Sequence, residues 1–494
     1  MLFTTKHKYL FPSLELNKVS INWVNTHKYL GVYLDTKLTY KNHLEHILAR
    51  VKQFGNQLLR CARCTWGLTT AAVSTLINGA IQPLLFYAAC CWAHVSYKTS
   101  YASKLLRVQR LFLLKKVRCC RSVSTDALTV LAGVLPWPLA LQAKVLQYYV
   151  RTDCISTHHE HLLWRTGIHL FPREWAVLNG SLHPTDFHLP DVSLDPIPTT
   201  GPAIPSDVYI FTDGSKSELG VGSSVCVYTH LHENPRQILR QRYNQATTIY
   251  QAELAAIHQA VQWSLTLPER FKFISILSDS KAALTSLTST NLRNSMIRNI
   301  QENVSLSSKC FKFFYVPGHA GVVGNEMADT AAKDASKDEN LPLTIQPYSR
   351  NTLTRIIYDH LILEWNQSWT SSTKGNVTKM FYPTIYDFLR NPINNFSYSL
   401  SQILTGHGNF NCYLAARNLA SSTFCSCASG KAETVQHILY ECHIYEIERF
   451  RLMLEVLSLG YGWPCPAHIL VSKELCAYFN FFIKDIFKKK RLCV

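Results

Sequence analysis

Apolar residues recur every three or four positions through a long first part of the chain, from residue 44 to about 149. Leu105, Val108 and Phe112 belong to this stripe. Because such spacing puts apolar side chains on one face of an α-helix, it predicts a mostly helical region, to which we assign residues 1–180. In residues 181–206 proline, aspartate, serine and threonine replace the stripe, which predicts an extended linker and a domain boundary.

The pattern after the linker changes to short apolar runs typical of β-strands. These runs are residues 208–211, 221–228, 237–243, 273–277 and 311–316. Helical patterns occupy residues 249–264, 281–287 and 326–333. This order predicts an α/β domain over residues 207–338 with a mixed five-stranded sheet. Helical spacing resumes from about Asn351, so the expected fold is multidomain, with mostly α-helical regions at 1–180 and 339–494 flanking the α/β domain.

Composition and charge narrow the class of protein. Of the 494 residues 47% are hydrophobic and 17% charged, which is globular composition and argues against a disordered chain. Residues 1–150 hold 12 Lys and 7 Arg against four acidic residues, a net charge of +15 out of +17 for the whole chain. Such a basic block favours a polyanionic partner, and we expect the backbone of a nucleic acid; a solvated basic face is the alternative.

Cysteine content and hydropathy point to a protein of the cell interior, in the nucleus or the cytoplasm. Sixteen cysteines in a chain of this length are too few for a disulfide scaffold, and no signal segment follows Met1, so we expect them to be reduced. Cys61 and Cys64 are interpreted as core residues. The most apolar window, residues 76–95, is interrupted by Asn78 and Pro83, which predicts a buried helix pair and no membrane contact.

Four acidic residues of the α/β domain occupy positions suited to one shared site. Asp213 and Asp279 each follow a predicted strand, Glu253 borders the buried stripe of a helix, and Asp329 lies in a helix rich in small residues. Four carboxylates at one sheet edge would repel one another unless cations lay between them. Oxygen ligands select magnesium or manganese, and two such ions serve phosphodiester cleavage. For any one acid alone, a helix cap or a surface charge is the simpler interpretation.

The neighbours of these acids occur in a defined order. The chain reads Thr212-Asp213-Gly214-Ser215, Gln251-Ala252-Glu253-Leu254, Ser278-Asp279-Ser280, and then Pro317-Gly318-His319-Ala320-Gly321 ahead of Asp329. Over about residues 207–338 this order resembles type-1 ribonuclease H. The resemblance implies cleavage of the RNA strand of RNA/DNA hybrids, with the four acids as catalytic ligands of two magnesium or manganese ions. It also implies that His319 handles a proton or assists product release.

The N-terminal region carries a second resemblance. Residues 28–43 resemble the segment just after the palm of non-LTR retrotransposon reverse transcriptases, and the helical block after them, with Trp92, resembles their thumb region. Polymerases of that family need an Asp-Asp pair in a palm domain, and this chain contains no Asp-Asp dipeptide. We therefore expect no reverse-transcriptase activity, and the chain is similar to the C-terminal part of such an element's polyprotein, without the palm.

Residues 425–442 contain a candidate zinc site. Cys425, Cys427, His437 and Cys442 supply three thiolates and an imidazole, a ligand set that zinc accepts. The segment resembles the C-terminal zinc knuckle of the same retrotransposons, as does the earlier Leu404-Thr405-Gly406-His407-Gly408. One residue separates Cys425 from Cys427, where zinc sites usually have two or more, and buried cysteines without a metal are the alternative.

Two hypotheses about function follow. The first is a metal-dependent ribonuclease H in a retrotransposon-derived chain that binds nucleic acid. The second is a catalytically impaired remnant of a reverse transcriptase that still binds nucleic acid. The presence of all four acids favours the first. The sequence makes no prediction about oligomeric state.

Overall fold

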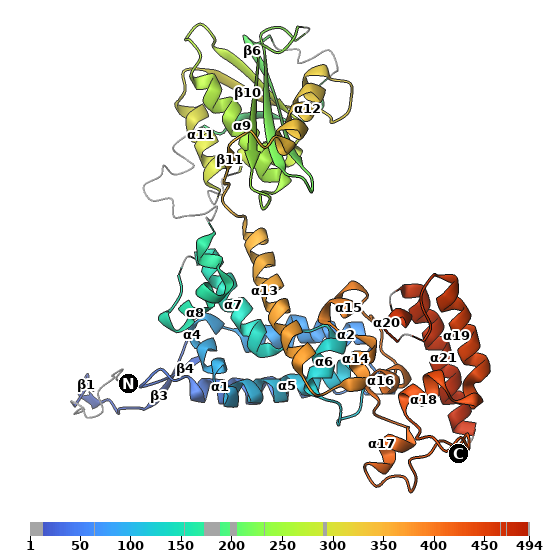
Figure 1. The fold of residues 1–494 in the computed structure, drawn as a ribbon. Coiled ribbons are helices and arrows are strands. Elements are labelled where there is room, and N and C mark those ends of the chain that lie inside the picture. The colour runs from blue at the N-terminus through green and yellow to red at the C-terminus, as the bar shows by residue number, and fades with distance from the viewer. Residues whose placement is uncertain are drawn as a thin grey trace. The chain divides into compact units, whose positions relative to one another are not determined.

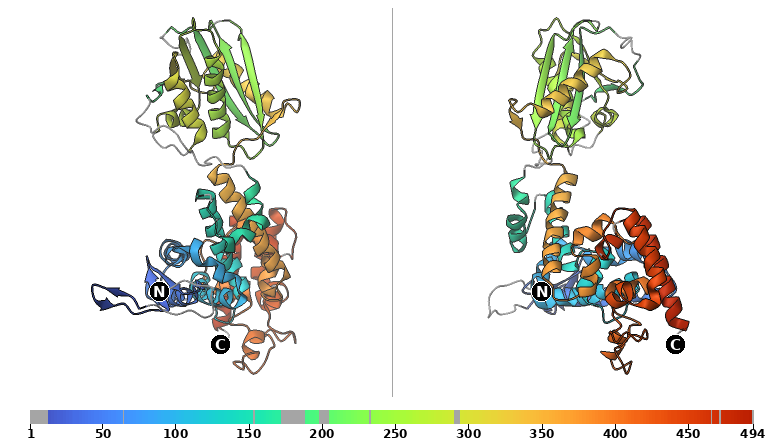
Figure 2. Two further views of the ribbon diagram at one scale, coloured as in Figure 1. Left: turned by 90° about the vertical axis from the view of Figure 1, so that its left-hand side faces the viewer. Right: turned by 45° about the vertical axis from the view of Figure 1, so that its right-hand side comes forward.

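The structure is a computed structural model that describes residues 13–63, 65–152, 154–171, 188–197, 205–231, 233–289, 294–464, 466–470 and 472–492. The chain divides into two compact units, drawn in Figures 1 and 2. Residues 167–356 form one, which we call the sheet unit, and residues 1–166 together with 357–494 form the other, which we call the helical unit.

The sheet unit is built on a seven-stranded mixed sheet in the order β11-β8-β7-β6-β9-β10-β5. The five predicted strands are β6 (Val208–Lys216), β7 (Val221–Tyr228), β8 (Gln237–Tyr243), β9 (Phe273–Ser278) and β10 (Cys310–Tyr315). Strands β6, β7 and β8 pair antiparallel, while β9 is parallel to both β6 and β10.

Two further strands correct the predicted count of five. β5 (Asp191–Ser193) pairs parallel with β10, and β11 (Leu343–Thr344) pairs parallel with β8. Each is an edge strand of two or three residues, too short to show an alternation of apolar and polar positions. β5 lies inside the expected linker, so this part of residues 181–206 joins the sheet; residues 181–187 and 198–204 lie outside the described residues.

Helices cover both faces of this sheet. Ile210 packs with residues of α9 (Ile249–Leu265), α10 (Lys281–Leu287) and α11 (Ser295–Leu306), whereas the next residue, Phe211, packs with α12 (Val323–Lys337). Because successive side chains of a strand point to opposite faces, α9 to α11 lie on one face and α12 on the other. Figure 1 shows α9 and α12 beside the strands.

The helical unit joins the two ends of the chain in one core. Its longer helices are α1 (Lys41–Leu58), α5 (Thr99–Val117), α6 (Thr125–Ala132), α7 (Trp137–Thr152), α13 (Arg350–Ser371, whose first residues belong to the sheet unit), α16 (Tyr398–Thr405), α19 (Glu446–Ser458) and α21 (Lys473–Leu492). Leu113, Trp369 and Phe479 are buried in the same cluster. The two flanks were predicted as separate regions. Residues some 250 positions apart share this core, and no pattern of neighbouring residues in the sequence indicates such a contact.

The rest of the N-terminal part consists of short elements. They are the two-stranded sheets β1 (Glu15–Leu16) with β2 (Val19–Ser20) and β3 (Thr26–Tyr29) with β4 (Val32–Asp35), and the helices α2 (Thr70–Leu76), α3 (Gln82–Phe86), α4 (Ala89–Trp92) and α8 (Glu160–Thr166). The C-terminal part adds α14 (Asn376–Phe381), α15 (Ile385–Arg390), α17 (Asn411–Ala415), α18 (Val435–Tyr440) and α20 (Pro466–Ile469).

Two expectations about apolar and cysteine residues can be compared with this unit. Across the described ranges, no single helix has both the length and the apolar character needed to cross a membrane, although two bent helix pairs meet that test when taken together. The apolar window folds into α2 to α4, with Ile81, Leu85 and Trp92 buried. Every cysteine in the described part of the chain is free. Cys61 is exposed, so its interpretation as a core residue was wrong, and Cys64 lies outside the described residues.

Candidate active site and metal centre

Two neighbouring parallel strands bring Asp213 and Asp279 together. In the register of β6 and β9, Thr212 pairs with Ser278. Asp213 is the next residue of β6, and Asp279 is the first residue after β9. The sequence predicted that Asp213 follows its strand. In the structure it lies within β6, which continues to pair with β7 as far as Lys216. Its side chain is buried rather than exposed, and β9 ends beside it.

Helix α9 brings Glu253 to the same place. The helix begins with a capping box, in which Thr248 accepts from the backbone of Gln251 and the Gln251 side chain accepts from the backbone of Thr248. Gly214 of β6 faces the helix so closely that an added Cβ would lie 2.5 Å from the backbone nitrogen of Glu253. The absence of a side chain at Gly214 therefore allows α9 to contact β6 and places Glu253 next to Asp213.

The three carboxylates form a group that fits divalent cations. One oxygen from each of Asp213, Glu253 and Asp279 lies within 4.8 Å of the others. Burial, followed by the charge of Asp279, raises the pKa of Asp213 to about 7. Burial, followed by the charges of Asp213 and Asp279, raises the pKa of Glu253 to about 9. Glu253 Oε2 is buried without a hydrogen-bond partner, and a magnesium or manganese ion would satisfy that oxygen and relieve the repulsion.

Asp329 approaches this group from α12 without joining it. Its negative charge contributes to the raised pKa values of Asp213 and Glu253, but it lies outside the group of three, and Lys333 Nζ binds it at 2.6 Å. The small residues that the sequence shows in α12 allow this helix to approach the sheet closely. A Cβ added at Gly324 would lie 2.3 Å from the ring of Phe211.

The loop between β10 and α12 carries His319. The residue is exposed and has a left-handed backbone conformation, with φ of 55°. The preceding Gly318 packs on Asp279, since an added Cβ would lie 3.1 Å from Asp279 Oδ2. His319 is therefore the residue next to Gly318, which contacts Asp279 of the carboxylate group.

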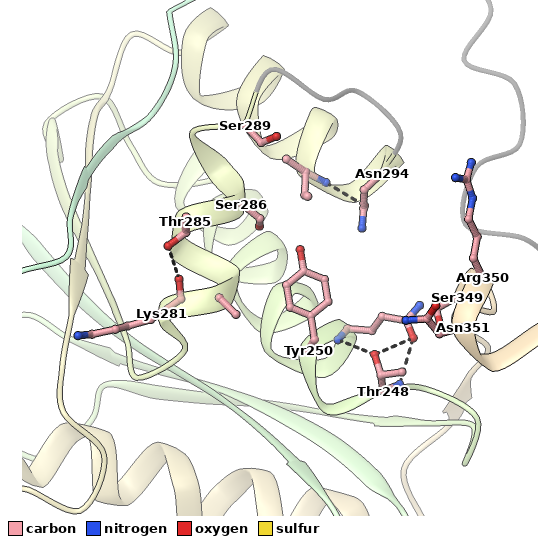
Figure 3. Close-up of a pocket in the computed structure, with 13 residues that line it drawn as sticks. Thr248, Tyr250, Lys281, Thr285, Ser286, Ser289, Asn294, Ser349, Arg350 and Asn351 are labelled. Carbon is pink, nitrogen blue, oxygen red and sulfur yellow. Dashed lines mark hydrogen bonds between the residues drawn. The ribbon is translucent and has the colours of Figure 1, made fainter. Parts of the chain in front are cut away.

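A cavity of about 1060 Å³ in the same unit is lined by residues of α9, α10 and α11 and of the segment at the start of α13 (Figure 3). Gln251 and Lys281 line it, and each is two residues from one of the acids, although the acids themselves do not line it. The other lining residues are Thr248, Tyr250, Ala282, Thr285, Ser286, Ser289, Asn294, Ile297, Ser349, Arg350 and Asn351.

Sequence reasoning missed residues that line this cavity. Asn294 lines the cavity and caps α11, but Arg298 is buried and held by Glu302 at 2.7 Å. Thr248 was missed, although Thr248 and Gln251 form a capping pattern that is visible in the sequence. Arg350 was missed because its place depends on the segment after β11, where the Gln251 side chain donates to the carbonyl of Pro347 at 2.7 Å.

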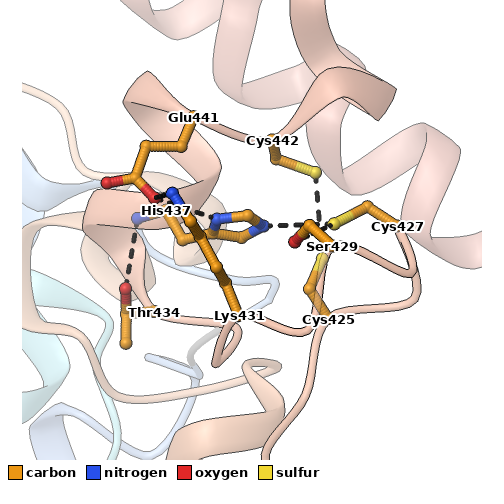
Figure 4. A network of polar contacts seen from close by, with 8 residues as sticks. All are labelled: Cys425, Cys427, Ser429, Lys431, Thr434, His437, Glu441 and Cys442. Carbon is orange, nitrogen blue, oxygen red and sulfur yellow. Dashed lines mark hydrogen bonds and ion pairs between the residues drawn. The ribbon is translucent and has the colours of Figure 1, made fainter.

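The four candidate zinc ligands form a second group, in the helical unit (Figure 4). Cys425, Cys427, His437 and Cys442 are all buried, and their ligand atoms lie within 4.8 Å of one another. The sulfurs of Cys425 and Cys442 are 3.8 Å apart, and Cys427 Sγ is 3.3 Å from His437 Nε2. Zinc–sulfur bonds of about 2.3 Å in a tetrahedron require sulfurs roughly 3.8 Å apart. The short Cys425 to Cys427 spacing is thus compatible with a tetrahedral site.

Contacts around this group orient the histidine. The Thr434 side chain caps α18 by accepting from the backbone of His437 at 3.1 Å. His437 Nδ1 lies 3.4 Å from Glu441 Oε2, and Lys431 binds the same carboxylate at 3.0 Å. A carboxylate behind the far ring nitrogen is the usual outer contact of a metal-bound histidine, because it fixes the ring and its tautomer. Nε2 is then directed at the three cysteines, as Figure 4 shows.

Comparison with known families identifies the class of the central part of the chain. Residues 205–337 match the RNase H family model and form an RNase H domain. The match begins and ends within a few residues of the region defined above by the motifs, and it spans β6 to α12.

Homologues of the chain are Pol polyproteins of R1 non-LTR retrotransposons. The chain is 34% identical over 129 residues to "Retrovirus-related Pol polyprotein from type-1 retrotransposable element R1" of Bradysia coprophila. The aligned stretch covers 26% of this chain and 13% of that protein. The chain is 32% identical over 140 residues, 28% of this chain and 35% of the relative, to the R1 4 Pol polyprotein of Nasonia vitripennis. A Drosophila melanogaster relative, the putative 115 kDa protein in element R1DM, is 27% identical over 140 residues, 28% of this chain and 14% of the relative. The matched stretches thus span 13% to 35% of these relatives.

Proposed function

We propose that the RNase H domain cleaves the RNA strand of RNA/DNA hybrids with two divalent metal ions. The observation that carries the proposal is the group of buried Asp213 and Glu253 and half-buried Asp279, whose oxygens lie within 4.8 Å of one another and whose mutual repulsion bound cations would relieve. Hydrolysis of a phosphodiester at such a site yields two shorter RNA strands, with the DNA strand left intact.

Each residue has a distinct role in this proposal. Asp213, Glu253 and Asp279 hold the ions, and Asp329 completes the set from α12 once Lys333 releases it. Bound magnesium or manganese would supply an activated water and stabilise the leaving oxygen. His319, on its exposed loop, accepts or donates the proton that the reaction transfers.

Recognition of the hybrid would depend on shape and backbone, because a nuclease of this kind has no use for base sequence. The cavity of Figure 3 offers hydroxyl and amide groups and the guanidinium of Arg350 as contacts for phosphates. The basic helical unit adds binding to the nucleic-acid backbone, and we propose that Cys425, Cys427, His437 and Cys442 hold a structural zinc ion there. The proposal includes no reverse-transcriptase activity.

The decisive experiment is cleavage of a labelled RNA strand by the full chain. The strand is annealed to DNA or to RNA and incubated with or without magnesium; omitting magnesium is preferable to a chelator, which would also remove zinc. We expect magnesium-dependent cleavage of the hybrid only. Asp213→Asn should reduce the rate by more than the roughly 10–100-fold that outer contacts of a metal site contribute.

A matched control is Asp334→Asn, which removes an exposed carboxylate from α12 and should cleave at the wild-type rate. Hybrid cleavage that survives Asp213→Asn would refute the assignment of the site. A folded chain that binds the hybrid but does not cut it in magnesium or manganese would establish the alternative, a catalytically impaired remnant.

A further inference from the structure

A second polar cavity, of about 520 Å³, lies within the helical unit. Two stretches of the chain that are more than 240 residues apart contribute to it: α5 with the start of α6 and the turn ahead of it, and the segment from the loop after α13 to the residue pair at the end of α16. Its lining residues are Arg110, Ser122, Val123, Ser124, Thr125, Asp126, Ala127, Lys374, Gly375, Thr378, Thr405 and His407. Most of these side chains are polar, and the basic ones come from different segments.

Arg110 carries a charge that the protein itself does not neutralise. Its guanidinium is partly buried and donates to Thr125 Oγ1 at 3.2 Å and to the carbonyl oxygen of Arg121, both of which are uncharged. Within the described ranges, no carboxylate pairs with Arg110. Burial lowers its pKa, as expected for a cation removed from water without a counter-ion. A bound anion would remove this cost.

His407 belongs to a rigid polar network at the same cavity. Ser122 Oγ lies 2.8 Å from His407 Nδ1 and 2.5 Å from the hydroxyl of Tyr413. The guanidinium of Arg417 stacks over the Tyr413 ring at 4.1 Å. With Nδ1 engaged, Nε2 is the ring nitrogen left for a ligand. Burial, followed by the charges of Arg417 and Arg110, lowers the pKa of His407, which indicates an excess of positive potential here.

Lys374 completes the cationic lining. It is exposed, and in the part of the chain that the structure describes its ammonium has no partner. Asp126 is the acidic residue among those that line the cavity, and its carboxylate accepts from Ser372 Oγ at 2.7 Å. Since Asp126 stands in the first turn of α6, the helix dipole partly offsets its charge. The balance of the lining therefore favours an anion.

We propose that this cavity binds a phosphate group of a nucleic-acid backbone, with Arg110, Lys374 and His407 as its contacts. The proposal rests on the proposed binding of nucleic acid by the helical unit and names the place where it occurs. The occupant is a nucleic acid because the unit as a whole is strongly basic: its residues hold 34 Lys and Arg against 16 acidic residues. Such a field attracts a polyanion to the surface around the cavity.

The test measures binding of a fluorescent RNA/DNA hybrid to the full chain carrying Asp213→Asn, so that cleavage does not interfere. On that background Lys374→Ala should weaken binding several-fold and make the slope of log K against log salt shallower by about 0.9, the value for one lost phosphate contact. Lys374→Arg should restore both. Lys52→Ala, which removes another exposed lysine of the unit from outside the cavity, should leave the slope unchanged.

Three results would overturn the proposal in different ways. Equal losses for Lys374→Ala and Lys52→Ala would show that the charge of the unit acts as a whole and that the cavity is not a site. A Lys374-dependent rise in melting temperature with inorganic phosphate, without any effect on hybrid affinity, would assign the cavity to free phosphate. No binding of the hybrid by a folded chain would refute the proposed function as well.

Discussion

The two units of this chain differ sharply in charge. The sheet unit, residues 167–356, holds 16 basic and 17 acidic residues, a net charge of −1, whereas the helical unit holds 34 basic and 16 acidic residues, a net charge of +18. The sheet unit gathers carboxylates into a buried group, and the helical unit gathers cations around a cavity and thiols around a histidine.

This difference reflects two physical requirements that conflict within one surface. A site that holds metal ions needs concentrated negative charge, which repels a nucleic acid. Strong binding of a nucleic acid needs positive charge spread over a wide area. In the proposed function the two requirements are met by separate units: the RNase H domain keeps its acids, and the basic helical unit would supply the attraction. We therefore expect perturbations of one unit to leave the other intact.

The largest expected effect is on the stability of the helical unit after loss of zinc. Structural zinc sites contribute about 10–16 kcal/mol of apparent binding free energy, so Cys425→Ser should unfold the region around the group. Thermal unfolding should lose the transition of the helical unit and keep that of the sheet unit. Metal analysis should find one zinc ion per wild-type chain.

Cys412→Ser is the matched control, since this free cysteine of the same region lies outside the group. It should keep both the zinc and the transition. A wild-type chain that contains no zinc and melts normally would show that the four residues are buried without a metal.

The second effect concerns His319. His319→Asn should lower kcat for hybrid cleavage by about 100-fold, the lower end for a general acid or base, because the side chain can no longer transfer a proton near pH 7. Affinity for the hybrid should not change, since the proposed role of His319 is proton transfer and not contact with a phosphate. His230→Asn, on another exposed loop of the sheet unit, is the control and should retain activity.

A third effect separates binding from chemistry. If the helical unit contacts three phosphates, raising the salt concentration from 50 to 200 mM should weaken hybrid binding by about 40-fold. The value of kcat at saturating hybrid should stay nearly constant, because two of the three carboxylates, Asp213 and Glu253, are buried and poorly screened. A flat dependence of affinity on salt would remove the electrostatic role of the helical unit.

Sequence reasoning was most successful where the structure is local. Residues 208–211 and 273–277 were predicted as strands from their apolar runs and lie within β6 and β9, and the RNase H domain was predicted within a few residues of its match. β5 and β11 escaped prediction because two or three residues have no periodicity. Ser122 and His407 are 285 residues apart, so their contact exists only once the two ends of the chain share a core.

The smallest expected effect is a pH dependence of the sheet unit without metal. The pKa values of Asp213 and Glu253 are raised from 3.8 and 4.5 to about 7 and about 9, so the folded state binds more protons than the unfolded state between about pH 4 and 9. Stability must therefore fall as the pH rises through this window. We expect the melting temperature to drop by at least about 5 °C from pH 5 to pH 8 in the absence of divalent ions.

Magnesium at pH 8 should recover this loss, because it binds the ionised carboxylates that repel one another. Asp213→Asn should flatten the pH dependence and weaken the response to magnesium, because it removes one of the three charges. The control Asp334→Asn should change neither. The measurement separates the units, because the same titration should leave the transition of the helical unit indifferent to magnesium. A sheet unit whose melting temperature rises with pH would contradict the raised pKa values and, with them, the electrostatic argument for two metal ions.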